Sequence, residues 1–175
     1  VIGWRQFDSV ESNFRQAGHG YSHDGGHTWL FAGSLAPGSF HSDPVLAADK
    51  NGRFYYHAIT GGLAGDLFRS ADGGLTWVGP TPGRAGDKPW MAVDRTNGSG
   101  AGNLYICSRG GFAKSSDGGE SFVSIPSEGC QGGTVVVGPR GLVYMTAGYP
   151  GCPEFIRSYG VPDPSVNPSF APPID

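Results

Sequence analysis

Two aspartates stand at similar places in the chain, each shortly before a proline and an apolar run. They are Asp43, in Asp43-Pro44-Val45-Leu46, and Asp87, in Asp87-Lys88-Pro89-Trp90-Met91. A pair of carboxylates can exchange protons with a substrate, bind a cation or accept hydrogen bonds from sugar hydroxyls. An aspartate in this context also commonly caps a loop or bridges two neighbouring elements. We expect the two residues to occupy equivalent positions in the fold. They are the first candidates for a ligand site.

Arginines supply a second kind of candidate chemistry. The guanidinium fork suits a carboxylate ligand, and Arg5, Arg15 and Arg109 would provide such forks. Single exposed arginines are more often solvated or paired with a carboxylate, so both interpretations stay open. No catalytic residue is assigned, and the candidates for one are Asp43, Asp87 and Arg15. The candidates for ligand binding are Asp43, Asp87, Lys88, Trp90, Arg109 and Tyr149.

Three histidines, His19, His23 and His27, follow one another at intervals of four residues. On a helix this spacing would suit a metal ion, but the region shows no helical periodicity. We expect exposed histidines in or near a turn. The sequence predicts no metal site and no cofactor.

A repeated eight-residue motif indicates how the candidate side chains are positioned. Its copies begin at Ser22, Ser70 and Ser115, which are 48 and 45 residues apart. In each copy an Asp can accept backbone N–H bonds within its own turn, and two glycines supply the positive φ of a tight reversal. Ser and Thr hydroxyls can close the turn, and the last aromatic packs on the sheet. We call these segments the repeat turns and expect structural roles for Ser22, Asp24, Gly26, Thr28, Trp29, Ser70, Asp72, Gly74, Thr76, Trp77, Ser115, Asp117, Gly119, Ser121 and Phe122.

The sequence around each repeat turn predicts four antiparallel strands. An apolar run, a glycine turn and an aromatic or β-branched run lead to a third strand, and a fourth strand follows the repeat turn. Four antiparallel strands in about 45 residues form the blade of a β-propeller. We predict an all-β propeller with blades at roughly 1–40, 41–85, 86–129 and 130–161, and a Pro-rich tail or linker at 162–175.

The two outer repeats are incomplete. The first lacks an innermost strand, and in the fourth no Asp-Gly-Gly follows Ser158. Two complete and two partial blades make an incomplete ring, because a closed propeller needs roughly four to eight blades. We expect a fragment of a longer polypeptide whose remaining blades come from the same or another chain.

Composition agrees with a β-rich fold. The 175 residues include 31 Gly and 14 Pro, and 15% are charged. No apolar run approaches the roughly 18 residues of a membrane span. The net charge of −3 and the lack of a basic stripe argue against a nucleic-acid partner. Cys107, Cys130 and Cys152 allow one disulfide with one free thiol, as in a secreted protein, or three unpaired thiols.

The pattern Ser-x-Asp-x-Gly-x-Thr-Trp resembles the Asp-box, or bacterial neuraminidase repeat. Gly3-Trp4-Arg5-Gln6-Phe7, Ser42-Asp43-Pro44 and Asp87-Lys88-Pro89-Trp90 are similar to segments of secreted bacterial Asp-box proteins of the sialidase-like kind. The resemblance implies a propeller and an extracellular or periplasmic location. It does not imply sialidase activity, because Asp-boxes also occur in receptors, assembly factors and binding proteins.

The arginine motif of true sialidases is absent from the expected place. Sialidases carry their first catalytic arginine in Phe/Tyr-Arg-Ile-Pro, whereas this chain has Phe14-Arg15-Gln16-Ala17, seven residues before Ser22. We therefore expect a non-catalytic secreted module that binds glycan or protein, or serves as a structural module. The alternative is a sialidase-like exo-glycoside hydrolase whose active site is completed by sequence outside this chain.

Propeller topology also separates the candidate residues from the repeat turns. The repeat turns would share one face with the turn at Asn51-Gly52. The starts of the inner strands, and with them Asp43 and Asp87, would lie on the opposite face.

Overall fold

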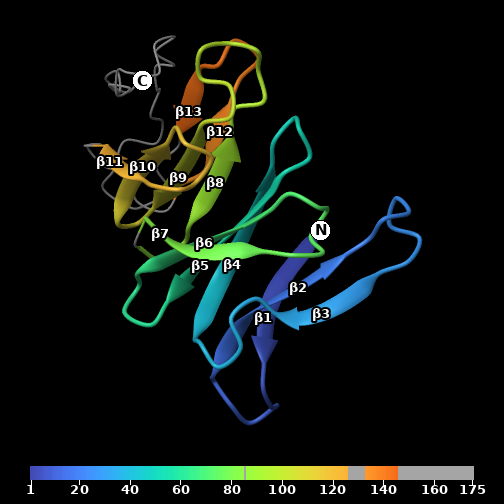
Figure 1. Ribbon diagram of the computed structural model, residues 1–175. Helices are drawn as coiled ribbons and strands as arrows, with labels where there is room; N and C mark the ends of the chain where they lie inside the picture. Colours follow the sequence, from blue (N-terminus) through green and yellow to red (C-terminus); the bar gives the residue numbers. More distant parts are fainter. Residues whose placement is uncertain (85, 126–132, 146–175) are drawn as a thin grey trace.

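The computed structural model describes residues 1–84, 86–125 and 133–145. Within these ranges the chain is all β, with thirteen strands in four antiparallel sheets, which we call sheets A to D (Figure 1). Sheet A holds β1 (Ile2–Phe7), β2 (Arg15–Tyr21) and β3 (Leu30–Ser34). Sheet B holds β4 (His41–Ala48), β5 (Phe54–Thr60), β6 (Gly65–Ser70) and β7 (Val78–Gly83). Sheet C holds β8 (Trp90–Val93), β9 (Leu104–Ser108), β10 (Gly111–Ser115) and β11 (Val123–Ile125), and sheet D holds β12 (Val135–Val137) and β13 (Val143–Met145).

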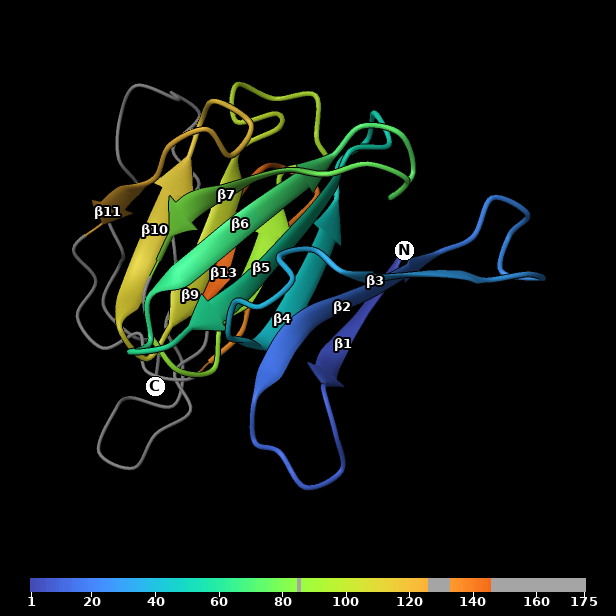
Figure 2. The ribbon, with the colours of Figure 1, turned by 60° about the horizontal axis from the view of Figure 1, so that its bottom comes forward.

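Within each sheet the strands are neighbours in chain order, and every pair is antiparallel. The all-β prediction is confirmed, and the two central repeats form the expected four-stranded sheets. The first strands of successive sheets contact one another: β1 contacts β4, β4 contacts β8, and β8 contacts β12. The sheets thus follow one another in a propeller-like arrangement, with sheets A and D at its two ends (Figures 1 and 2).

Alternation of side chains along each strand gives every sheet two different apolar faces. We call the face toward the preceding sheet the leading face, and the face toward the following sheet the trailing face. The core between sheets A and B contains Ala17, Leu46, Tyr56, Ala58 and Phe68. The core between sheets B and C contains Tyr55, Leu67, Met91, Leu104 and Ile106. The core between sheets C and D contains Tyr105, Phe112, Val135, Val143 and Met145.

The repeat turns join β2 to β3, β6 to β7 and β10 to β11. Their closing aromatics do not all pack as we expected. Trp77 and Phe122 pack against the cores on the leading sides of sheets B and C. Trp29 remains 37% exposed, because among the described residues no sheet covers the leading side of sheet A.

The described residues form strands and turns, and they contain no helix long and apolar enough to cross a membrane.

One cysteine of the described chain is oxidised. Cys107, fully buried on β9, is disulfide-bonded, which excludes three unpaired thiols. Cys130, Cys152 and the tail at 162–175 lie outside the described residues.

Candidate functional site

The two ends of the sheet stack differ in what they carry. One end, the turn end, holds the three repeat turns and the β4–β5 turn at Asp49–Arg53. The other end, the cavity end, holds the starts of β4 and β8 together with the β1–β2, β5–β6 and β9–β10 loops. Two neighbouring cavities of about 620 and 420 Å³ lie at the cavity end.

Both cavities are lined by candidates from the sequence. Arg5, Asp43 and Lys88 line the two of them. The larger cavity also has Trp90 in its wall, and the smaller one has Asp87 and Arg15. The fold therefore gathers at one place residues that are up to 85 positions apart in the chain, from Arg5 to Trp90.

The smaller cavity is lined by unusual backbone. Three described residues other than glycine have positive φ: Asp43 at 50°, Leu63 at 64° and Lys88 at 56°. All three line this cavity. Positive φ costs an ordinary residue about 1–2 kcal/mol, and at Asp43 and Lys88 the following proline disfavours helical conformations further. Such strain gathers at functional sites, where the surrounding structure holds it in place.

The structure corrects the expected equivalence of Asp43 and Asp87. Asp43 and Lys88 both directly precede a proline and share the left-handed conformation, so these two positions correspond. Asp87 therefore corresponds to Ser42. Near Asp43 the β4–β5 register shifts between Ser42 and Val45, and an irregularity of this kind redirects side chains at the rim of a sheet.

A chain of polar contacts connects sheets A and B across the smaller cavity. Arg5 forms an ion pair with Asp43, whose Oδ1 also accepts a hydrogen bond of 2.9 Å from Ser42 Oγ. Ser42 Oγ accepts in turn from Arg15 Nη1 at 3.2 Å. The Arg15 guanidinium lies 5.7 Å from the centre of the Phe40 ring, within cation–π range. Its buried Nε donor has no hydrogen-bond partner among the described residues.

A second pair connects the start of β8 to the β9–β10 loop. Arg109 Nη1 lies 3.5 Å from Asp87 Oδ2, and the backbone N–H of Arg109 donates to the carbonyl of Asp87 at 2.9 Å. Asp87 is thus held by both backbone and side-chain contacts. Its side chain is 31% exposed, so solvent still reaches this pair.

The charged residues that line the two cavities are three cations, Arg5, Arg15 and Lys88, and two carboxylates, Asp43 and Asp87. The lining therefore carries one more positive than negative charge, although the whole chain has a net charge of −3. Trp90 is 49% exposed and gives the larger cavity an aromatic wall.

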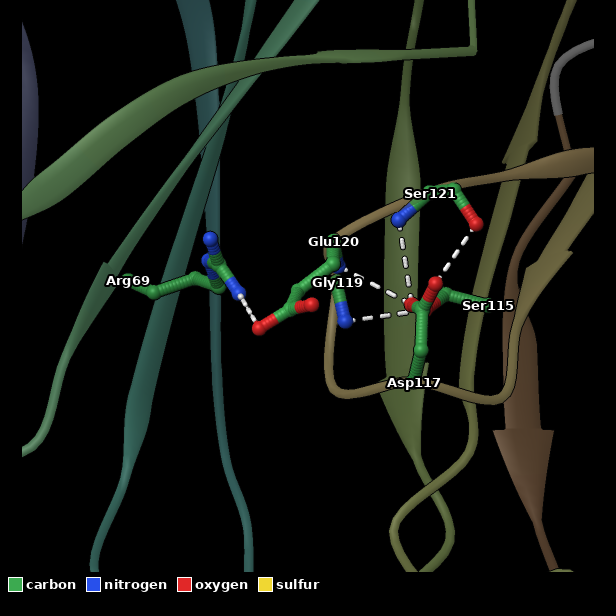
Figure 3. Close-up of polar contacts among 6 residues, drawn as sticks. All are labelled: Arg69, Ser115, Asp117, Gly119, Glu120 and Ser121. Atoms are coloured by element: carbon green, nitrogen blue, oxygen red, sulfur yellow. Dashed lines mark hydrogen bonds and ion pairs between the residues drawn. The ribbon is translucent and has the colours of Figure 1, made fainter.

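At the turn end the hydrogen bonds form closed local sets. Ser115 Oγ donates to Asp117 Oδ1 at 2.7 Å and accepts from the Gly119 N–H at 2.8 Å (Figure 3). Asp117 accepts from the Ser121 N–H at 3.0 Å and from Ser121 Oγ at 2.5 Å. Glu120 in the same turn reaches Arg69 of sheet B at 3.4 Å. The turns around Asp24 and Asp72 repeat the Ser–Asp–Thr contacts at 2.5–2.9 Å.

These contacts lower the pKa values of the repeat-turn carboxylates. Hydrogen bonds from the side chain and backbone of Thr76 are the main reason that the pKa of Asp72 is about 2. Partial burial raises the pKa of Asp117, but the hydrogen bonds from Ser121 and Ser115 outweigh it and bring the value to about 2. The Thr28 hydroxyl and N–H lower the pKa of Asp24 in the same way. A carboxylate held ionised by its own turn suits a structural role.

The histidines differ from expectation at one position. His19 is buried, at 4% exposure, and packs its ring 5.7 Å from Trp77, while His23 and His27 are exposed. Its burial lowers the pKa of the imidazole, which its contact with the Gly33 carbonyl only partly offsets. Within residues 1–84, 86–125 and 133–145, no group of three or more His, Cys, Asp or Glu side chains is placed to hold a metal ion.

The sequence candidates thus divide into three groups. Asp43, Asp87, Lys88 and Trp90 line the cavities, and Arg109 reaches them through Asp87. Tyr149 lies outside the described residues. Ser42, Phe40 and Leu63 line the smaller cavity but were missed. The glycine pair before Leu63 marks a turn, yet no sequence signal indicates that the turn faces Asp43.

The chain matches no protein-family model and none of the curated proteins.

Proposed function

We propose that this chain is part of a secreted Asp-box β-propeller and acts as a non-catalytic module that binds acidic glycans. Three repeat turns at the same joint of three successive sheets support the propeller, as does the propeller-like stacking of those sheets. The disulfide at Cys107 supports secretion, because such bonds persist mainly in oxidising compartments.

One observation carries the binding proposal: every described non-glycine residue with positive φ lines one cavity that also holds Arg5 and Arg15. Stability alone would favour glycine at these three positions. Side chains are kept at Asp43 and Lys88 despite the strain, which favours a role in contacting a ligand.

The chemistry of the cavity favours an anionic sugar. Arginine forks bind carboxylates in a bidentate manner, and the excess positive charge attracts an anion. Asp43 and Ser42 offer acceptors for sugar hydroxyls. The exposed ring of Trp90 offers a flat apolar surface, which is suited to the C–H face of a pyranose. Cavities of about 620 and 420 Å³ are within the usual size range of small-ligand sites.

Calorimetry with a matched pair of sugars tests the proposal. A sialylated lactose should bind, and neutral lactose should bind at least tenfold more weakly. Arg15→Ala and Trp90→Ala should each weaken binding of the acidic sugar by about tenfold or more, corresponding to ~1.4 kcal/mol or more. Arg140→Ala, which removes an exposed arginine at the turn end, is the control and should bind as wild type does. Equal binding of both sugars, or none of either, would contradict the proposal.

The hydrolase alternative rests on one specific observation, namely that Asp43 and Asp87 line the same cavity. Two carboxylates flanking a glycosidic bond are the usual machinery of glycoside hydrolysis. A fluorogenic sialoside distinguishes the two functions. Turnover by the wild type that is lost in both Asp43→Asn and Asp87→Asn would replace the binding module with an enzyme.

A further inference from the structure

Two Asn-Gly dipeptides lie at the turn end, Asn51-Gly52 in the β4–β5 turn and Asn97-Gly98 in the β8–β9 loop. A contact between Lys50 and Asn97 brings the two loops together. Both dipeptides are exposed. An asparagine before glycine is prone to deamidation, because glycine has no Cβ to hinder attack by its own backbone nitrogen. The same reactive dipeptide therefore occurs in two different surroundings, which can be compared.

The charges near such a dipeptide influence how fast it reacts. Deamidation begins when the glycine N–H gives up its proton and the nitrogen attacks the side-chain carbonyl carbon of the asparagine. A new C–N bond closes a succinimide ring, and the side-chain nitrogen leaves with the transferred proton as ammonia. Water then opens the ring at either carbonyl, which leaves aspartate or isoaspartate. Negative charge develops on the backbone nitrogen and then on the side-chain oxygen, so a neighbouring cation favours the reaction and an anion opposes it.

At Asn97 a cation contacts the oxygen that takes up this charge. Lys50 Nζ donates to Asn97 Oδ1 at 2.6 Å and to the Thr96 carbonyl at 3.2 Å, which holds the ammonium beside the dipeptide. The N–H of Gly98 donates to Thr96 Oγ1 at 3.2 Å, so its proton faces a neutral hydroxyl. An ammonium in contact with a developing oxyanion stabilises it.

At Asn51 the charge beside the dipeptide has the opposite sign. Asp49 Oδ1 accepts from the Asn51 N–H at 2.8 Å and from the Arg53 N–H at 3.0 Å, so the N–H groups on both sides of Gly52 point at a carboxylate. Asp49 is buried, at 7% exposure, so solvent screens its charge only weakly. This carboxylate opposes both the loss of the Gly52 proton and the growth of negative charge on Asn51.

We propose that Asn97 is a deamidation site, that Lys50 promotes the reaction there, and that Asn51 is protected by comparison. The reaction adds one negative charge to the net charge of −3. It also replaces the neutral amide beside Lys50 by a carboxylate. The modification therefore converts a hydrogen bond between the β4–β5 turn of sheet B and the β8–β9 loop of sheet C into an ion pair.

Peptide mapping by mass spectrometry tests the proposal on the folded chain, incubated in warm and mildly alkaline buffer. Each deamidation replaces an NH2 group by OH, and chromatography separates the isoaspartate product from the aspartate product. Position 97 should convert about fivefold faster than position 51, because the neighbouring charges have opposite signs. Lys50→Met should slow conversion at position 97 by about threefold, the size expected for one exposed contact with a cation.

Two matched variants and one solvent condition serve as controls. Lys50→Arg keeps a cation at this place and should convert nearly as fast as the wild type. Arg140→Met removes another exposed cation at the turn end and should leave the rate at position 97 unchanged. In concentrated urea the two dipeptides should convert at similar rates, since unfolding removes both neighbouring charges.

Three results would overturn the proposal. In the first, position 51 of the folded chain converts as fast as position 97. In the second, Lys50→Met converts faster than the wild type, which would mean that the contact restrains the amide instead of activating it. In the third, a peptide joins positions 50 and 97 after loss of ammonia, which would show attack by the lysine nitrogen in place of the glycine nitrogen. None of these results depends on sugar binding at the cavity end.

Discussion

The turn end and the cavity end of the same sheets are built in opposite ways. At the turn end the three motifs repeat one set of short hydrogen bonds, and glycines take the positive φ values. At the cavity end Asp43, Leu63 and Lys88 take positive φ without being glycine. One end minimises strain and satisfies its polar groups locally, whereas the other keeps strain and unbalanced charge. This difference is the basis for proposing that the repeated motif stabilises the fold and that the non-repeated end binds the ligand.

The largest expected loss of folding stability comes from replacing a glycine of a repeat turn with alanine. Gly119 has φ of 86°, and a Cβ there would lie 2.5 Å from Cδ2 of the fully buried Leu67, so the core would have to shift to admit it. Gly119→Ala should destabilise the fold by about 3 kcal/mol and lower Tm by roughly 10 °C.

Gly118 provides the matched control in the same turn. It has φ of 72°, and its nearest contact would be Arg53 Nη1 at 3.6 Å. Gly118→Ala should therefore cost only the left-handed backbone strain, about 1 kcal/mol. Thermal unfolding measures both variants, and equal losses would show that the contact with sheet B is unimportant.

A smaller effect should appear in the pH dependence of stability. The folded-state pKa values of Asp72 and Asp117 are about 2, below the ordinary aspartate value of 3.8. Because the folded pKa is depressed, these carboxylates stabilise the fold above pH 3.8 and lose that contribution as the pH falls toward 2. The Tm difference between wild type and Asp117→Asn should therefore shrink between pH 5 and pH 2.

Ser116→Ala serves as the control for the acid experiment. Ser116 is an exposed, variable position of the same turn, so this variant should follow the wild type at every pH. If the Tm difference for Asp117→Asn stays constant across this pH range, protonation of Asp117 does not cause the loss of stability in acid.

The sequence predicted the turn end better than the cavity end, for a physical reason. Every contact of Asp117 within its turn lies within four residues, so the motif contains its own hydrogen-bond partners. The contact between Arg5 and Asp43 spans 38 residues and depends on how sheet A packs on sheet B. From the sequence we aligned Asp43 with Asp87, the other aspartate shortly before a proline. The backbone shows that Lys88 is the equivalent of Asp43, because both have positive φ directly before a proline, and the sequence does not show this conformation.

The smallest effect would sharpen the comparison most, because it should separate stability from binding at one position. Lys88→Gly removes the left-handed strain of a side-chain-bearing residue before proline and should stabilise the fold by about 0.5–1 kcal/mol, after the entropy cost of glycine. The same change should weaken binding of an acidic sugar. Lys88→Ala removes the ammonium but keeps the Cβ, so it should weaken binding without gaining stability. If Lys88→Gly stabilises the fold and Lys88→Ala does not, the strained backbone at this position is retained because the lysine side chain is needed there. If both variants bind as wild type does, the lysine has no ligand role and the strain belongs to the backbone path into β8.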